Sequence, residues 1–163
     1  MAFLIGFGNF GLFDFMKRPA RNLLDWFQCA AGWWALFFLW ALGLTIATCI
    51  PGRDLPTTPF PDFDKAVHFT AFLVGAVVLF PAIRLASHWR LLAVAGVTFV
   101  LISVYGIMDE FKQLWVPGRK GGDWADIAAN SLGAAVGVIM LWLIYGYSIG
   151  RSKNARRLAP KRD

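Results

Sequence analysis

Three pairs of polar side chains have the types and the helical spacing that proton transfer or ligand binding requires. The members of each pair are three or four positions apart: Asp64 with His68, Glu110 with Gln113, and Asp126 with Asn130. Residues at these separations share one face of an α-helix. Carboxylates and imidazoles transfer protons, and amides orient a bound group through hydrogen bonds. We therefore predict that three helices present these pairs to one shallow polar pocket.

Two cations lie close to these pairs in the sequence. Lys65 directly follows Asp64, and Arg119 follows the turn signal Pro117-Gly118. A guanidinium grips phosphate or carboxylate with two parallel hydrogen bonds, whereas an ammonium acts as a point charge. We predict that Lys65 and Arg119 bind the anionic part of a ligand in the pocket.

Each of these residues also has a structural interpretation. Carboxylates and bases near lipid can simply neutralise one another, and an isolated histidine such as His68 is more commonly a hydrogen-bonded residue at a helix end. The sequence shows no activated serine or cysteine nucleophile, and one histidine with carboxylates is a poor set of zinc ligands. We therefore predict no metal site and no cofactor. The candidate catalytic residues are His68 and Glu110, and enzymatic activity is left open.

Four long apolar stretches must position these side chains. The chain has 163 residues, of which 58% are hydrophobic and 16% are charged, and its mean hydropathy is +0.55. Globular chains carry ~25% charged residues, and a membrane-spanning helix needs ~20 mostly apolar residues. Stretches that approach or meet this length cover residues 29–50, 66–83, 91–108 and 127–150. Because the first stretch has no charged residue, a soluble bundle is disfavoured, and we predict an all-α membrane protein with four transmembrane helices.

The remaining segments flank this domain. Residues 1–28 form an aromatic, glycine-rich segment with a basic flank, for which we predict an interfacial location, and residues 151–163 form a basic tail. Within the transmembrane domain, residues 29–150, the small residues Ala129, Gly133 and Gly137 recur every four positions. Such a ridge allows another helix backbone to approach closely, so we predict that it packs against a neighbouring helix.

The basic residues predict the orientation of the chain. Of the sixteen lysines and arginines, eleven lie before residue 22, between residues 84 and 90, or after residue 150. Cytoplasmic flanks carry the excess of such residues, so both termini are predicted to be cytoplasmic and the polar pairs to face outward. The net charge of +6 is therefore explained by the orientation of the chain in the membrane. We predict no nucleic-acid partner.

The same residues form an ordered series of short motifs. They are D-K-x-x-H-F at 64–69, D-E-x-x-Q at 109–113, V-P-G-R at 116–119, Asp126, and A-N-x-x-G at 129–133. In this order and spacing the region 62–141 resembles the VanZ-like family of small bacterial membrane proteins, named after an accessory protein linked to teicoplanin resistance. The resemblance implies that the binding positions are Asp64, Lys65, His68, Glu110, Gln113, Arg119, Asp126 and Asn130. Lys112 departs from the pattern, because similar sequences often have histidine there.

Three functional hypotheses follow for a multi-pass protein of the bacterial cytoplasmic membrane. The first is a cell-envelope accessory factor whose outward pocket binds a lipid headgroup or a cell-wall precursor, with the link to glycopeptide (teicoplanin) tolerance that the resemblance implies. The second is a membrane enzyme that acts on a lipid-linked substrate with His68 and Glu110 as acid and base. The third, ion or proton transport, is disfavoured because the middles of the spans hold almost no charge. The ligand and the oligomeric state are left open, and the lipid bilayer is the general partner.

Overall fold

The computed structural model describes residues 29–55 and 59–158, with side chains as far as Arg151. The predicted interfacial segment, residues 1–28, lies outside the described residues. The described part is all-helical and contains α2 (Ala30–Thr48), α3 (Phe63–Ala86), α4 (Leu91–Gln113) and α5 (Trp124–Leu158), with a short 3-10 turn, η2 (Gly52–Asp54). Four helices are long and apolar enough to cross a membrane, the last over Trp124–Arg151. The predicted fold class is therefore confirmed.

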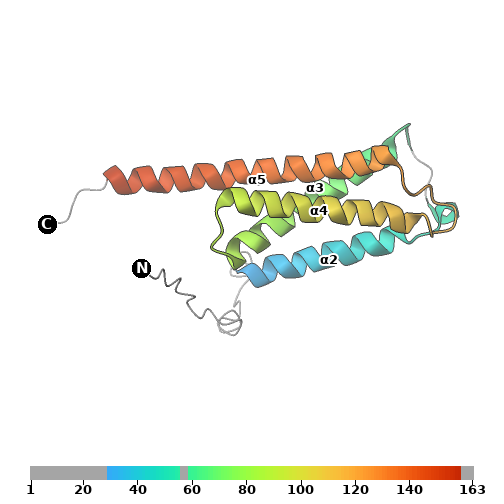
Figure 1. Cartoon of the computed structure of the whole chain (residues 1–163), viewed down its shortest axis with the longest axis horizontal. Coiled ribbons are helices and arrows are strands. Elements are labelled where there is room, and N and C mark those ends of the chain that lie inside the picture. Colours follow the sequence, from blue (N-terminus) through green and yellow to red (C-terminus); the bar gives the residue numbers. More distant parts are fainter. Residues whose placement is uncertain (1–28, 56–58, 159–163) are drawn as a thin grey trace, which may run out of the picture.

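The four helices lie side by side in one bundle (Figure 1). Helices α3 and α4 each contact the other three helices, and α3 packs most extensively against α5. The buried core lies mainly between α3, α4 and α5 and includes Phe72, Leu79, Phe80, Val94 and Ile102. Large apolar side chains remain exposed on the outer faces, as on α2 and α4. Such faces are compatible with hydrocarbon, since helices in lipid do not need to bury every apolar residue inside the protein.

Three helices extend beyond the predicted apolar stretches at the polar end of the bundle. Helix α3 begins at Phe63 rather than at residue 66, α4 continues to Gln113, and α5 begins at Trp124. A search for apolar runs ends where polar residues start, although these residues are compatible with a helix. The consequence is that the predicted site residues on these three helices lie in regular secondary structure.

Two carboxylates, Asp62 and Asp64, lie at the start of α3. Asp62 occupies the N-cap position with a left-handed backbone (φ 59°), but its side chain makes no capping hydrogen bond. Its carboxylate instead lies 3.3 Å from Lys65 Nζ. Asp64 lies inside the first helical turn, where a negative charge interacts favourably with the helix dipole. Asp62 therefore contributes to the start of α3 through its ion pair with Lys65 rather than as a side-chain cap.

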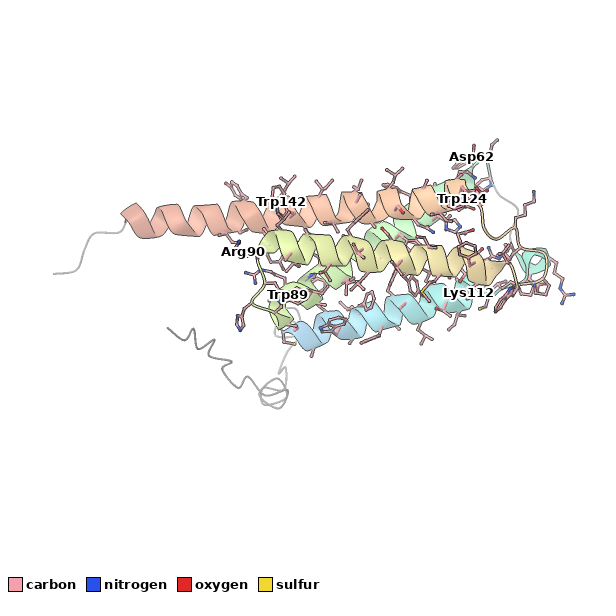
Figure 2. All side chains as sticks on the ribbon, viewed as in Figure 1. Asp62, Trp89, Arg90, Lys112, Trp124 and Trp142 are labelled. Carbon is pink, nitrogen blue, oxygen red and sulfur yellow. The ribbon has the colours of Figure 1, made fainter. Side chains whose placement is uncertain are left out.

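The loops at this end are held together by close backbone contacts. Gly52 N donates to Pro117 O at 2.9 Å, so the α2–α3 connection touches the α4–α5 connection. The second connection also folds back on α4, because Gly122 N donates to Glu110 O at 3.2 Å. We call this end of the bundle the site end. In Figure 2, Asp62, Lys112 and Trp124 lie at the site end, whereas Trp89 and Arg90 lie toward the opposite end.

The ridge of small residues on α5 packs against α3, as predicted. A Cβ at Gly137 would lie 2.8 Å from Leu73 O and 3.0 Å from the Ala76 side chain. A Cβ at Gly133 would clash with the backbone carbonyl oxygen of Phe69. Because both obstacles include backbone of α3, the two helices cannot relieve the contact by a side-chain rotation alone.

Gly133→Ala is expected to lower the melting temperature of the purified protein in detergent. The added methyl group must separate α5 from α3, and such overpacking typically costs about 1–3 kcal/mol. Gly96→Ala is the matched control, because a Cβ at Gly96 meets nothing within 4 Å and alanine favours the helix. Equal melting temperatures for the two variants would contradict this packing.

Candidate functional site

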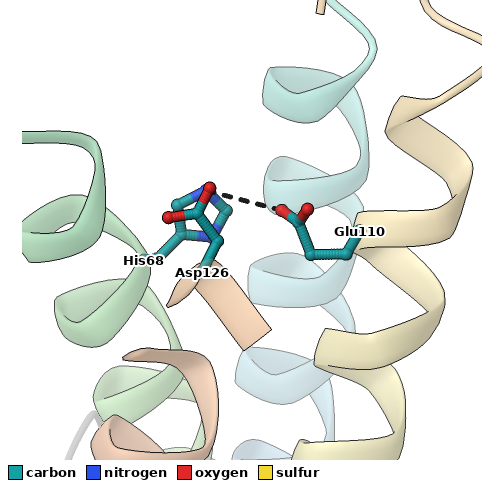
Figure 3. Close-up of side chains that lie close together, drawn as sticks. All are labelled: His68, Glu110 and Asp126. Atoms are coloured by element: carbon teal, nitrogen blue, oxygen red, sulfur yellow. Dashed lines mark ion pairs between the residues drawn. The ribbon is translucent and has the colours of Figure 1, made fainter. Parts of the chain in front are cut away.

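Four polar side chains from three helices meet at the site end. His68 comes from α3, Glu110 from α4, and Asp126 and Asn130 from α5. His68 Nε2 lies 3.7 Å from Glu110 Oε1 and 4.0 Å from Asp126 Oδ2. Figure 3 shows the imidazole and the Glu110 carboxylate facing each other from different helices. We call these four residues the site cluster.

Asn130 fixes the orientation of His68. His68 Nδ1 lies 3.0 Å from Asn130 Oδ1, and the same amide directs its Nδ2 toward Gly106 O at 3.5 Å. Because an amide oxygen only accepts hydrogen bonds, Nδ1 of His68 must carry the proton and donate it to this bond. The other ring nitrogen, Nε2, is thereby turned toward Glu110 and Asp126.

Glu110 is almost fully buried, with 1% of its surface exposed. Its Oε1 accepts a hydrogen bond from Gln113 Nε2 at 3.2 Å. Its Oε2 accepts one from the backbone N–H of Asp123, also at 3.2 Å. The α4–α5 connection therefore reaches back to hold this carboxylate in place. Gly121 makes the approach possible, because a Cβ there would lie 2.7 Å from Glu110 O.

Asp126 is buried but poorly partnered. Its exposed fraction is 6%, and its fully buried Oδ1 has no hydrogen-bond partner among the described residues. The cation beside it is Lys65, whose Nζ lies 3.7 Å from Oδ1, beyond hydrogen-bonding distance. Lys65 Nζ lies closer to Asp62, at 3.3 Å, and to Asp64, at 3.5 Å. Asp126 therefore receives only part of the charge compensation that Lys65 supplies.

A second polar network at the site end connects α4 with α2. Lys112 Nζ donates to Asp109 Oδ1 at 2.7 Å and to Thr48 Oγ1 at 2.6 Å. Thr48 Oγ1 in turn lies 2.8 Å from Asp109 Oδ1. Gln113 links this network to the site cluster, because its Nε2 also lies 3.2 Å from Asp109 Oδ2. Neither Thr48 nor Asp109 was among the predicted site residues, and Lys112 faces α2 rather than the cluster.

Arg119 and Asp64 lie outside the site cluster. Arg119 Nε donates to Ile50 O at 3.1 Å, and its Nη2 donates to Ala47 O at 2.9 Å. The guanidinium thus binds one carbonyl group in the last turn of α2 and one just beyond it. Asp64 is half-exposed and pairs with Lys65. Of the eight predicted binding residues, the structure brings four into the cluster and places Lys65 and Gln113 at its border. Arg119 and Asp64 lie outside it.

The site cluster contains a set of side chains with the composition of metal ligands. One ligand atom from each of His68, Glu110 and Asp126 lies within 4.8 Å of the other two. The imidazole can also act as an acid or a base toward the carboxylates. The cluster therefore offers two kinds of chemistry, proton transfer and cation binding, whereas the sequence led us to predict no metal site.

The protein is a bundle of four helices that are long and apolar enough to cross a membrane, and ionisable residues are buried at one end of it. These features are those of a small multi-pass membrane protein. The sequence model of the family described as VanZ/LLP1 matches residues 4–145. Because this match covers most of the chain, the protein belongs to the VanZ/LLP1 family. The match extends well beyond the motif region, 62–141, on its N-terminal side. No curated protein and no solved structure matches the chain.

Proposed function

We propose that this protein is a cell-envelope accessory factor of the bacterial cytoplasmic membrane that binds the polar headgroup of a lipid or of a lipid-linked cell-wall precursor at the site cluster. The observation that carries the proposal is the burial of Asp126 without a hydrogen bond to Oδ1. Buried polar groups normally have partners. An unsatisfied carboxylate at the end of a bundle is therefore a candidate for ligand binding.

The surroundings of the cluster suit a headgroup. Lys65, with 32% of its side chain exposed, is the cation that a phosphate oxygen would meet first. The carboxylates of Glu110 and Asp126 would accept hydrogen bonds from sugar hydroxyls or an amine. Trp115 and Trp124 are exposed at the same end, and tryptophans concentrate where membranes meet water. The site end would therefore lie at headgroup depth.

The predicted orientation can be tested with introduced cysteines in a background that lacks Cys29 and Cys49. If the site end faces outward, Lys120→Cys should react with a membrane-impermeant maleimide in intact cells. Trp89→Cys, on the exposed link at the opposite end, should react only after permeabilisation. Labelling in the reverse pattern would place the site cluster at the cytoplasmic surface and contradict an outward ligand site.

A second function is favoured by one specific contact. The bond from His68 Nδ1 to Asn130 Oδ1 holds the imidazole in one tautomer, with Nε2 3.7 Å from Glu110. A fixed imidazole beside a carboxylate is the arrangement that general acid–base catalysis uses. In this alternative the protein is a membrane enzyme that acts on a lipid-linked substrate.

Comparing membranes of cells with and without the gene separates these two functions. Mass spectrometry of total lipids should show unchanged headgroup and precursor species if the protein is an accessory factor, while sensitivity to teicoplanin changes. Loss or accumulation of a specific lipid-linked species, restored by re-expression of the gene, would favour the enzyme. Unchanged lipids together with unchanged teicoplanin sensitivity would contradict the accessory function.

A further inference from the structure

We propose that His68 Nε2, Glu110 and Asp126 form a binding site for a divalent transition-metal ion. This inference goes beyond the proposed function and does not rest on it, because it depends only on the contacts of the three side chains. One ligand atom from each residue lies within 4.8 Å of the others. His68 Nε2 lies 3.7 Å from Glu110 Oε1 and 4.0 Å from Asp126 Oδ2.

These distances are too long for hydrogen bonds and suit a shared cation. Hydrogen bonds between nitrogen and oxygen measure ~2.7–3.2 Å. Two ligands that each lie ~2.0–2.2 Å from one metal ion are separated by at most about 4.4 Å. Both measured distances from His68 fall inside that limit. His68 Nε2 is thus close enough to each carboxylate to share one ion with it, and the third separation is no more than 4.8 Å.

The tautomer of His68 strengthens this assignment. Because Nδ1–H donates to Asn130 Oδ1, Nε2 is the ring nitrogen that faces the two carboxylates. Metal-binding histidines typically donate the other ring N–H to an oxygen in this way, which fixes the ring and raises its basicity. Asn130 therefore occupies the supporting position that a histidine ligand requires.

The charges around the cluster also favour a bound cation. Two carboxylates, Glu110 and Asp126, are buried there, and burial of an uncompensated charge is strongly unfavourable. Lys112 is engaged by Asp109, and Lys65 lies 3.7 Å from Asp126 while also pairing with Asp62 and Asp64. A divalent cation would compensate both carboxylates, including that of Asp126, whose Oδ1 has no hydrogen bond and whose Oδ2 is the oxygen that lies near His68.

The ligand types indicate which metals fit. Imidazole suits zinc, copper, iron and nickel, whereas carboxylates also suit manganese. One imidazole and two carboxylates from three helices leave at least one coordination position open, as in sites where zinc binds water or substrate. Zn²⁺ is therefore the first probe, and Mn²⁺ is the second.

The test uses the full-length protein purified without a polyhistidine tag, stripped with a chelator and titrated with Zn²⁺ in competition with a chromophoric chelator. We expect one tightly bound equivalent in the wild type. His68→Gln and Asp126→Asn should each weaken binding at least about tenfold, since loss even of a supporting residue typically costs 10–100-fold. His88→Gln and Asp54→Asn are the matched controls, because both residues are exposed and lie outside the cluster, and they should bind like the wild type.

Two further measurements keep the test decisive if a variant fails to fold. Wild-type protein should gain thermal stability with the logarithm of the free Zn²⁺ concentration above its dissociation constant, and Co²⁺ should give the visible absorption bands of a site with nitrogen and oxygen ligands. Equal Zn²⁺ affinity in His68→Gln, Asp126→Asn and their controls would show adventitious binding and overturn the proposal. Wild-type protein that neither binds nor is stabilised by Zn²⁺ or Mn²⁺ would overturn it as well.

Discussion

Replacing Lys112 with methionine is expected to destabilise the protein by about 3 kcal/mol, because it leaves the buried carboxylate of Asp109 without its cation. The Asp109 side chain is 2% exposed, and its Oδ1 lies 2.7 Å from Lys112 Nζ. Methionine preserves most of the length and the apolar stem of lysine, so the change isolates the charge. The Lys112 side chain is 31% exposed, which places the effect at the lower end of the range for buried pairs. The measurement is the melting temperature in detergent.

Two companion variants define the cause of this loss. Lys120→Met removes a lysine from the exposed α4–α5 connection and should leave the melting temperature unchanged. Asp109→Asn combined with Lys112→Met should recover much of the lost stability, since no uncompensated charge then remains. If Lys112→Met alone matches the wild type, the ion pair contributes nothing to the stability of the protein.

The fold could be predicted because its main determinant, the length of each apolar run, is read directly from the sequence. A run such as residues 29–50, without a single charge, admits few structures other than a membrane-length helix. The helix bounds at the site end were less predictable, since Asp64 and Lys65 or Asp109 and Lys112 interrupt the apolar run without interrupting the helix. Polarity marks where a helix leaves the apolar layer, and backbone hydrogen bonding decides where the helix ends.

The meeting of His68, Glu110, Asp126 and Asn130 was predictable to the extent that helical spacing determines it. Residues three or four positions apart share a face, and all three helices bring their pairs to the site end, although Asp64 pairs with Lys65 and stays outside the cluster. The position of Arg119 was not predictable from the sequence. It depends on the contact of Gly52 with Pro117, which joins two loops far apart in the chain. The role of Thr48 likewise depends on which neighbour α2 meets, and a single threonine in an apolar run gives no signal of it.

The Asp126→Asn variant is expected to lose function in cells without losing stability. Its carboxylate is buried, and Oδ1 accepts no hydrogen bond from the described residues, so the neutral, nearly isosteric amide removes an unfavourable charge. A purely structural carboxylate would behave in the opposite way, because its removal would destabilise the protein and function would fall with it. The relation between stability and function therefore separates a ligand site from a structural ion pair.

The experiment expresses Asp126→Asn and Asp54→Asn in cells that lack the chromosomal gene. We expect both variants to accumulate in the membrane and to melt at or above the wild-type temperature in detergent. Asp54→Asn, in the exposed loop after α2, should restore wild-type teicoplanin sensitivity, whereas Asp126→Asn should leave the sensitivity of the deletion strain. A stable Asp126→Asn protein that restores the wild-type phenotype would remove Asp126 from the functional site. Reduced accumulation of that variant would assign the carboxylate a structural role. Functional residues commonly reduce the stability of the protein, so replacing a functional carboxylate should not lower it.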